Sequence, residues 1–253
     1  MMRTALLSLA ACLVTACGGD APPPRESAAA RADTAALSGS SEPSSEATTP
    51  GTLPAVADPS PRTFVFLRHG AGGAVDTMGF EHFAREAGML TGELRSPGGP
   101  RTAYRAELTA DARVQSVELR GWPAGAPANA EPAEVARGSF RGDSLIGTAR
   151  QGGVTTESRV GTDHGAIPYL SPSVGLMEQV LRRARVLGGD SVQVPIFLLR
   201  GAGTTFLGTV VWAAPDSVIL SVGGSQGHLI VDGDLRILRG TNPAAGTSFT
   251  RIR

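Results

Sequence analysis

Apolar and polar residues alternate along most of the chain from Thr63 to its last residue. A period of two is typical of β-strands that bury one face and expose the other. The runs that show it are 63–68, 102–108, 113–119, 190–197, 204–212, 216–222, 228–232, 235–238 and 248–252. Allowing for shorter runs, the pattern predicts about a dozen short strands in this part of the chain.

Residues that favour turns separate these runs. They are Gly72-Gly73, Pro97-Gly98-Gly99, Gly188-Gly189, Gly223-Gly224 and Asp232-Gly233-Asp234. Short strands joined by such turns favour sequential antiparallel pairing. We therefore expect residues 63–253 to form a single, mainly β domain, an antiparallel meander that makes a curved sheet or an open half-barrel.

One segment follows the period of a helix instead. Ser171-Pro172 has the form of an N-cap followed by proline at the first helical position, and Gly188 is a stop signal. The apolar residues that fall on one helical face are Leu176, Val180, Leu181, Ala184 and Leu187. The basic residues of the last turn, interpreted as a solvated face, are Arg182, Arg183 and Arg185. A single amphipathic helix packed on the sheet is expected, and it is too short to cover that many strands, so a cavity or an open face should remain.

The first residues have the features of a targeting segment, with Arg3 followed by the apolar run 5–14. Val14-Thr15-Ala16-Cys17 then resembles the lipobox of bacterial lipoproteins. The resemblance implies that residues 1–16 are a signal peptide, that the Cys17 thiol is diacylated, and that the protein is membrane-anchored in the cell envelope, facing the periplasm or exterior. The alternative is an ordinary secretory signal in which Cys17 merely lies near the cleavage site.

Residues 17–62 contain no aromatic residue and are rich in Pro, Ala, Ser and Thr. Such a segment cannot bury enough apolar surface to offset the entropy of ordering it. It is expected to be a disordered tether between the lipid anchor and the domain.

The overall composition excludes several classes of protein. The 23 basic residues, all of them Arg, balance 23 acidic ones, so the excess of positive charge typical of nucleic-acid binding is missing. The two cysteines are too few for a disulfide framework. His69, His82, His164 and His228 have no ligand-like spacing, so we expect no metal site and no cofactor.

Leu67-Arg68-His69-Gly70 follows an apolar run and resembles the opening motif of the histidine phosphatases. The resemblance implies phosphoryl transfer to His69, with Arg68 and His164 as partners. The family continues with a helix, however, where this chain has the turn Gly72-Gly73, and one helix is too few for the family's α/β fold. We interpret the motif as a coincidence and name no catalytic residue.

In layout, the domain is similar to β-rich envelope domains and, distantly, to the lipoprotein carriers, whose curved sheet holds acyl chains. This resemblance implies a non-catalytic module that binds an apolar ligand or an envelope protein partner. The alternatives are an enzyme without a recognisable motif, such as a divergent phosphatase using Arg68, His69 and His164, and a purely structural domain. Aromatic residues expected to line a pocket are Phe64, Phe66, Phe80, Phe83, Tyr104 and Trp212.

Overall fold

The fold comes from a computed structural model that describes residues 53, 60–200 and 203–252. The expected signal peptide 1–16, Cys17 and almost all of the expected tether 17–62 lie outside the described residues. The first strand begins at Arg62, one residue before the expected domain boundary, and Arg62 is buried. No helix within the described ranges is long and apolar enough to cross a membrane.

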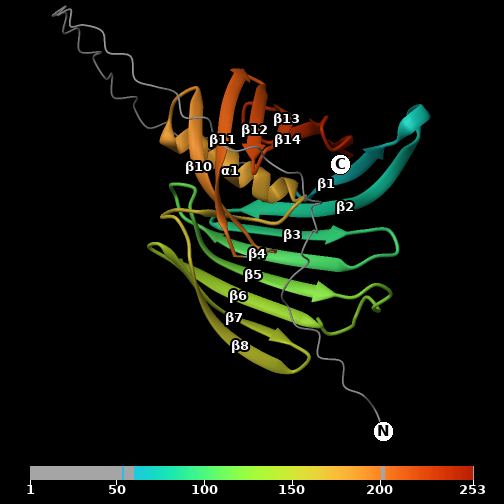
Figure 1. Ribbon diagram of the computed structural model, residues 1–253, viewed down its shortest axis with the longest axis vertical. Helices are drawn as coiled ribbons and strands as arrows, with labels where there is room; N and C mark the ends of the chain where they lie inside the picture. The colour runs from blue at the N-terminus through green and yellow to red at the C-terminus, as the bar shows by residue number, and fades with distance from the viewer. Residues whose placement is uncertain (1–52, 54–59, 201–202, 253) are drawn as a thin grey trace, which may run out of the picture. The chain divides into compact units, whose positions relative to one another are not determined.

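The described residues form one sheet of fifteen strands (Figure 1). The strands are β1 (Arg62–His69), β2 (Val75–Glu86), β3 (Met89–Arg95), β4 (Arg101–Leu108), β5 (Val114–Trp122), β6 (Glu134–Arg141), β7 (Ser144–Gln151), β8 (Val154–Gly161), β9 (Ile167–Tyr169), β10 (Ser191–Leu198), β11 (Thr205–Ala214), β12 (Ser217–Val222), β13 (Ser225–Val231), β14 (Ile237–Asn242) and β15 (Thr247–Arg251). A short 3-10 turn, η1 (Ala71–Gly73), joins β1 to β2, where the sequence predicts a hairpin turn.

The sheet consists of two meanders joined at β1 and β15. Its strand order is β8-β7-β6-β5-β4-β3-β2-β1-β15-β14-β13-β12-β11-β10-β9. Neighbouring strands pair antiparallel, except that β9 pairs parallel with β10. The expected mainly β, antiparallel fold class is confirmed, and the sheet remains open, with β8 and β9 as its edges.

The helix α1 (Val174–Leu187) lies inside the curve of this sheet (Figure 1). It contacts β9 and β10 at one end of the strand order and β2 and β3 near its middle. Strands from the two halves also meet directly, because the rings of Phe140 on β6 and Phe197 on β10 have centroids 6.2 Å apart. The sheet therefore curls, and its inner face and the helix enclose the apolar core.

The helix begins two residues later than the sequence predicts. Ser173, rather than Ser171, is the N-cap, and its hydroxyl oxygen accepts a hydrogen bond from the Leu176 backbone N–H at 3.2 Å. Ser173 is favoured because its own hydroxyl also donates to the buried Glu81 at 2.6 Å. Gly188 ends the helix with a φ of 79°, as expected for a glycine stop.

The last turn of α1 is not the solvated face that its arginines suggest. Arg182 is buried and donates to the Asp234 carbonyl oxygen at 2.7 Å. Arg183 donates to the Asp111 carbonyl oxygen at 3.0 Å. The guanidinium of Arg185 lies 3.9 Å from the centroid of the Trp212 ring, a cation–π contact. Because the sheet curves closely around the helix, these three arginines of α1 contact residues of the surrounding loops and strands.

Candidate functional site

A cavity of about 560 Å³ lies on the inner face of the sheet, beside the first turns of α1. Its walls come from β1, β2, β9 to β15 and the segment that leads into the helix. The residues that line it are Phe66, Met78, Tyr169, Ser171, Pro172, Met177, Leu198, Phe206, Leu220, Val222, Gly223, Ser225, Gly227, Leu229, Thr241, Asn242, Ala245, Thr247, Ser248 and Phe249. None of these lining residues carries a charge, so the walls favour an apolar occupant.

The register of the strands separates the apolar floor of this cavity from its polar rim. Side chains directly opposite each other across paired strands project on the same face. One cross-strand row of partners is apolar and runs through Leu229, Gly240, Phe249 and Phe66. The next row, two residues along each strand toward the hairpin turns, is Asn242, Thr247 and Arg68.

The rim is held together by hydrogen bonds between hairpins. The Asn242 side-chain amide donates to the Ser225 hydroxyl at 2.6 Å, and its carbonyl oxygen accepts from the Ala245 backbone N–H at 3.1 Å. These contacts fix the β12–β13 and β14–β15 turns relative to each other. The cavity therefore has a fixed polar rim above an apolar floor.

Gly227 contributes to the depth of the cavity because it has no side chain. A Cβ at this position would have no neighbour nearer than 3.8 Å. At Gly208 and Gly240, also in these strands, the space is already taken, by Ile196 and by Phe249, each with an atom 2.3 Å from where a Cβ would be. A glycine in a strand often marks a site where another group must approach closely, and at Gly227 that space is empty.

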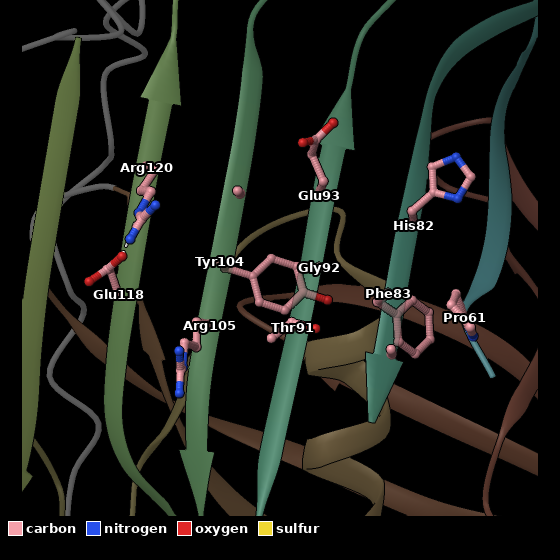
Figure 2. Close-up of a pocket in the computed structure, with 12 residues that line it drawn as sticks. Pro61, His82, Phe83, Thr91, Gly92, Glu93, Tyr104, Arg105, Glu118 and Arg120 are labelled. Carbon is pink, nitrogen blue, oxygen red and sulfur yellow. Dashed lines mark hydrogen bonds and ion pairs between the residues drawn. The ribbon is translucent and has the colours of Figure 1, made fainter. Parts of the chain in front are cut away.

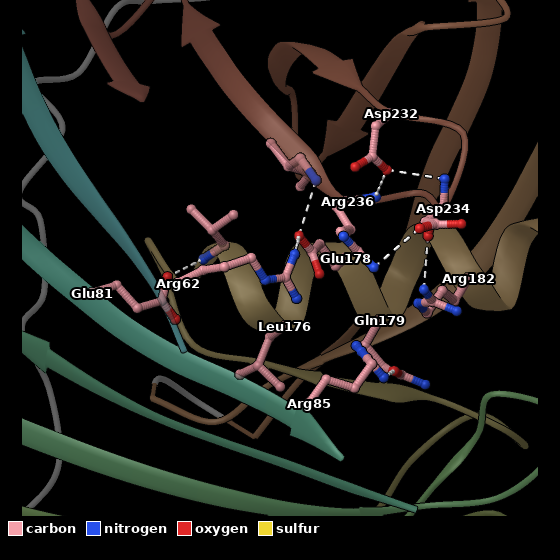
Figure 3. Close-up of polar contacts among 12 residues, drawn as sticks. Arg62, Glu81, Arg85, Leu176, Glu178, Gln179, Arg182, Asp232, Asp234 and Arg236 are labelled. Carbon is pink, nitrogen blue, oxygen red and sulfur yellow. Dashed lines mark hydrogen bonds and ion pairs between the residues drawn. The ribbon is translucent and has the colours of Figure 1, made fainter. Parts of the chain in front are cut away.

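A buried polar network lies on the other side of the core, between α1 and the sheet (Figure 3). The Glu178 carboxylate accepts a hydrogen bond from Arg62 Nη1 at 2.6 Å and from the Ile237 backbone N–H at 2.9 Å. Arg85 Nη1 donates to Gln179 Oε1 at 2.6 Å, and burial lowers the pKa of this guanidinium to about 10. These contacts hold the helix in place and open onto no cavity described above, so we assign them a structural role.

Glu81 lies at the N-terminal end of the helix, next to the cavity-lining segment Ser171-Pro172. Its carboxylate accepts hydrogen bonds from the Tyr104 hydroxyl at 2.8 Å, the Ser173 hydroxyl at 2.6 Å and the Val174 backbone N–H at 2.5 Å. Burial raises the pKa of Glu81 from 4.5 to about 7, against the lowering effect of these hydrogen bonds. This carboxyl group therefore changes charge near neutral pH while it caps α1.

A second depression, of about 480 Å³, lies over β2 to β5 (Figure 2). Figure 2 shows Glu118 and Arg120 on β5 joined by an ion pair, with Arg105 on the neighbouring strand. Glu118 also pairs with Arg137 on β6. Because its charges pair with each other on an exposed face, this depression is a weaker candidate than the apolar cavity.

The structure does not bring together the three residues of the phosphatase-like motif. His69 ends β1, where its Nε2 is 2.7 Å from the Ser248 hydroxyl. His164 is exposed in the β8–β9 connection, and the neighbouring Gly165 lies beside Arg113 and Arg183. Arg68 and His69 are consecutive in a strand, so their side chains project on opposite faces.

The aromatic residues expected to line a pocket have several different environments. Phe66 does line the apolar cavity, and Phe80 lines a smaller one of about 180 Å³ that shares Phe66 and Met78 with it. Phe64 is buried in the core, Phe83 and Tyr104 are buried there and also line the depression over β2 to β5, and Trp212 lies beneath Arg185. Most of the lining comes instead from β12 to β15, whose alternation predicts strands but not which face encloses a space.

Within residues 60–200 and 203–252, no group of three or more His, Cys, Asp or Glu side chains is placed to hold a metal ion. No family model and no curated protein matches this chain. Among solved structures, it is similar to a DUF1089 family protein from Pseudomonas aeruginosa, with a TM-score of 0.49 and 13% identity over 67% of this chain and 91% of the other. A beta-barrel-like protein of the domain of unknown function DUF1849 from Brucella abortus gives a TM-score of 0.44 and 10% identity over 76% and 93%. Nothing about function follows from likenesses this distant.

Proposed function

We propose that this domain is a non-catalytic binding module that holds an apolar ligand in the cavity between β1, β2, β9 to β15 and the start of α1. The observation that supports the proposal is a space of about 560 Å³ whose lining residues are all uncharged. Ligand pockets commonly have volumes of about 300–1,000 Å³ and mostly apolar walls with a few polar groups at fixed positions. The cavity favours an apolar ligand over a protein partner as the occupant, because a concave space of this size suits a small molecule.

Replacing Gly227 by leucine is expected to abolish ligand binding while leaving the fold intact. The new side chain would project into the cavity, and its Cβ would meet only ordinary contacts of 3.8 Å or more. We expect affinity for a fluorescent apolar probe such as a pyrene-labelled alkane to fall at least about tenfold. Stability should change by less than about 1 kcal/mol, since filling an existing space causes little strain.

The matched control is His228→Leu. His228 is exposed, is the next residue of β13, and projects on the opposite face, so this variant adds the same apolar side chain outside the cavity. It should bind the probe like the wild type. If both variants bind equally well, or the wild type binds no apolar probe, the cavity is not a ligand site.

We also propose that the mature chain is held at a cell-envelope membrane through a lipid on Cys17. The support is the lipobox Val14-Thr15-Ala16-Cys17 behind the apolar run 5–14, and two acyl chains give stable anchoring where one is marginal. Cys17→Ser should abolish metabolic labelling with a fatty acid and release the protein from the membrane fraction. Equal labelling of the two proteins would contradict lipidation at this residue.

A further inference from the structure

We propose that Arg68 binds an anionic head group at the rim of the cavity, so that the ligand is a single-chain amphiphile ending in a carboxylate or a phosphate. This inference rests on the proposed function, since it assigns the chemistry of the ligand in the same cavity. It gives a role to Arg68, which stands out in the sequence as part of the phosphatase-like motif Leu67-Arg68-His69-Gly70.

Arg68 lies on the inner face of the sheet, in the same row as the rim. It is two residues beyond the cavity-lining Phe66, so both side chains project on one face. Its cross-strand partner on β15 is Thr247, which also lines the cavity, and the partner of Thr247 on β14 is Asn242. The rim therefore continues from uncharged hydrogen-bonding groups directly to a guanidinium.

The guanidinium of Arg68 is exposed, and no hydrogen bond or ion pair joins it to another described residue. The next residue of the row is Asp76, on β2, the strand beyond β1. Adjacent strands are about 4.8 Å apart, so the first fixed charge met on leaving the cavity along this row is positive. This order of charges favours an anionic head group over a cationic one.

The cavity and the rim together select a ligand with two distinct ends. An ionised group could not enter the uncharged cavity without a large desolvation cost. At the rim it would stay partly hydrated and could accept paired N–H donors from Arg68, whose planar fork matches carboxylates and phosphates. The hydrocarbon chain would then lie against Phe66, Phe249 and the space beside Gly227.

The test compares ligands that share one chain and differ in head group: dodecanoate, dodecyl phosphate and dodecanol, each displacing the fluorescent probe at slightly alkaline pH. Arg68→Gln should weaken binding of both anions roughly five- to tenfold and leave dodecanol unchanged. Asp76→Asn should strengthen binding of the anions roughly twofold by removing a like charge. Added salt should weaken anion binding by the wild type and by every variant that keeps Arg68, but not by Arg68→Gln.

Arg239→Gln is the matched control, because Arg239 is exposed on β14 and is the partner of Thr250, on the face opposite to Gly240 and Phe249. This variant removes the same charge from the other side of the sheet, so the affinities for all three ligands should equal those of the wild type. A preference for either anion supports the inference and identifies the head group. Equal losses for dodecanol and the anions in Arg68→Gln, or no loss at all, would overturn it. Dodecanol binding by the wild type tests the proposed function by itself, because dodecanol has no charged head group. If dodecanol does not bind, the proposed function is contradicted.

Discussion

Replacing Glu178 by glutamine is expected to lower the free energy of unfolding by about 3–5 kcal/mol. The side chains of Arg62 and Glu178 are 5% and 1% exposed, and their charges are 2.6 Å apart. Removing the carboxylate charge leaves the guanidinium of Arg62 buried without its counter-ion. Arg85 and Arg182 interact electrostatically with the same carboxylate, so three cations would lose their shared partner.

Urea unfolding followed by circular dichroism would measure this loss. The control is Glu118→Gln, which also removes a carboxylate with two arginine partners, Arg120 and Arg137, but on an exposed face, and should cost less than about 1 kcal/mol. Adding Arg62→Met to Glu178→Gln should recover part of the lost stability, because it removes one unpaired charge. Equal losses of unfolding free energy in Glu178→Gln and Glu118→Gln would show that burial does not determine how much an ion pair contributes to stability.

The stability of the fold is expected to decrease as pH rises from below 4.5 to above 7, because of Glu81. The pKa of its carboxyl is about 7 in the folded protein and 4.5 as the ordinary value. The folded state therefore binds the proton more tightly than the unfolded state does. The stabilisation is complete below pH 4.5 and is lost as pH rises through 7, a difference of about 3 kcal/mol.

Urea unfolding of the wild type and of Glu81→Gln across this range would test the effect. The variant has no carboxyl group at position 81, so its free energy of unfolding should be nearly constant between pH 4.5 and 7. Hydrogen bonds and arginine partners hold the pKa values of Asp111 and Glu118 below the ordinary ones. These two carboxyls therefore make the fold more stable as pH rises, and they do so at a lower pH than Glu81. Equal slopes for wild type and variant would assign the pH dependence to another group.

The sequence pattern predicts the strands of the second meander well and fails on β2. The inner face of β2 carries Glu81, Phe83 and Arg85, which are all buried, while Phe80 and His82 face outward. Charged residues therefore take two inward positions, Glu81 and Arg85, where they form hydrogen bonds with Ser173 at the cap of α1 and with Gln179 on the helix. Those partners are about ninety residues away in the chain, so no local pattern could indicate them.

The strands β6 to β8 escape prediction for a different reason. Few of their residues are buried, and small residues such as Gly138, Gly147 and Ala149 replace the apolar side of the alternation. Pairing with neighbouring strands, rather than burial, keeps this part of the sheet extended. The cavity is likewise beyond the sequence, since the empty space at Gly227 and the filled spaces at Gly208 and Gly240 are distinguished only by neighbours on other strands.

The pairing of β1 with β15 determines when the sheet can be completed. Every other pair of neighbouring strands in the described chain is consecutive in sequence, and all of these except β9 and β10, which are joined through α1, can form by closing a short loop at small entropic cost. Only β1 must wait for residues 247–251, and Ile252 then adds a hydrogen bond to the Thr63 carbonyl oxygen at 2.8 Å. During synthesis, the β1–β8 meander can form early, while the edge of β1 that faces β15 stays unpaired. A chain cut short before β15 would thus present two further open edges, β1 and β14, in addition to β8 and β9, and aggregation rather than simple loss of stability should be its main defect.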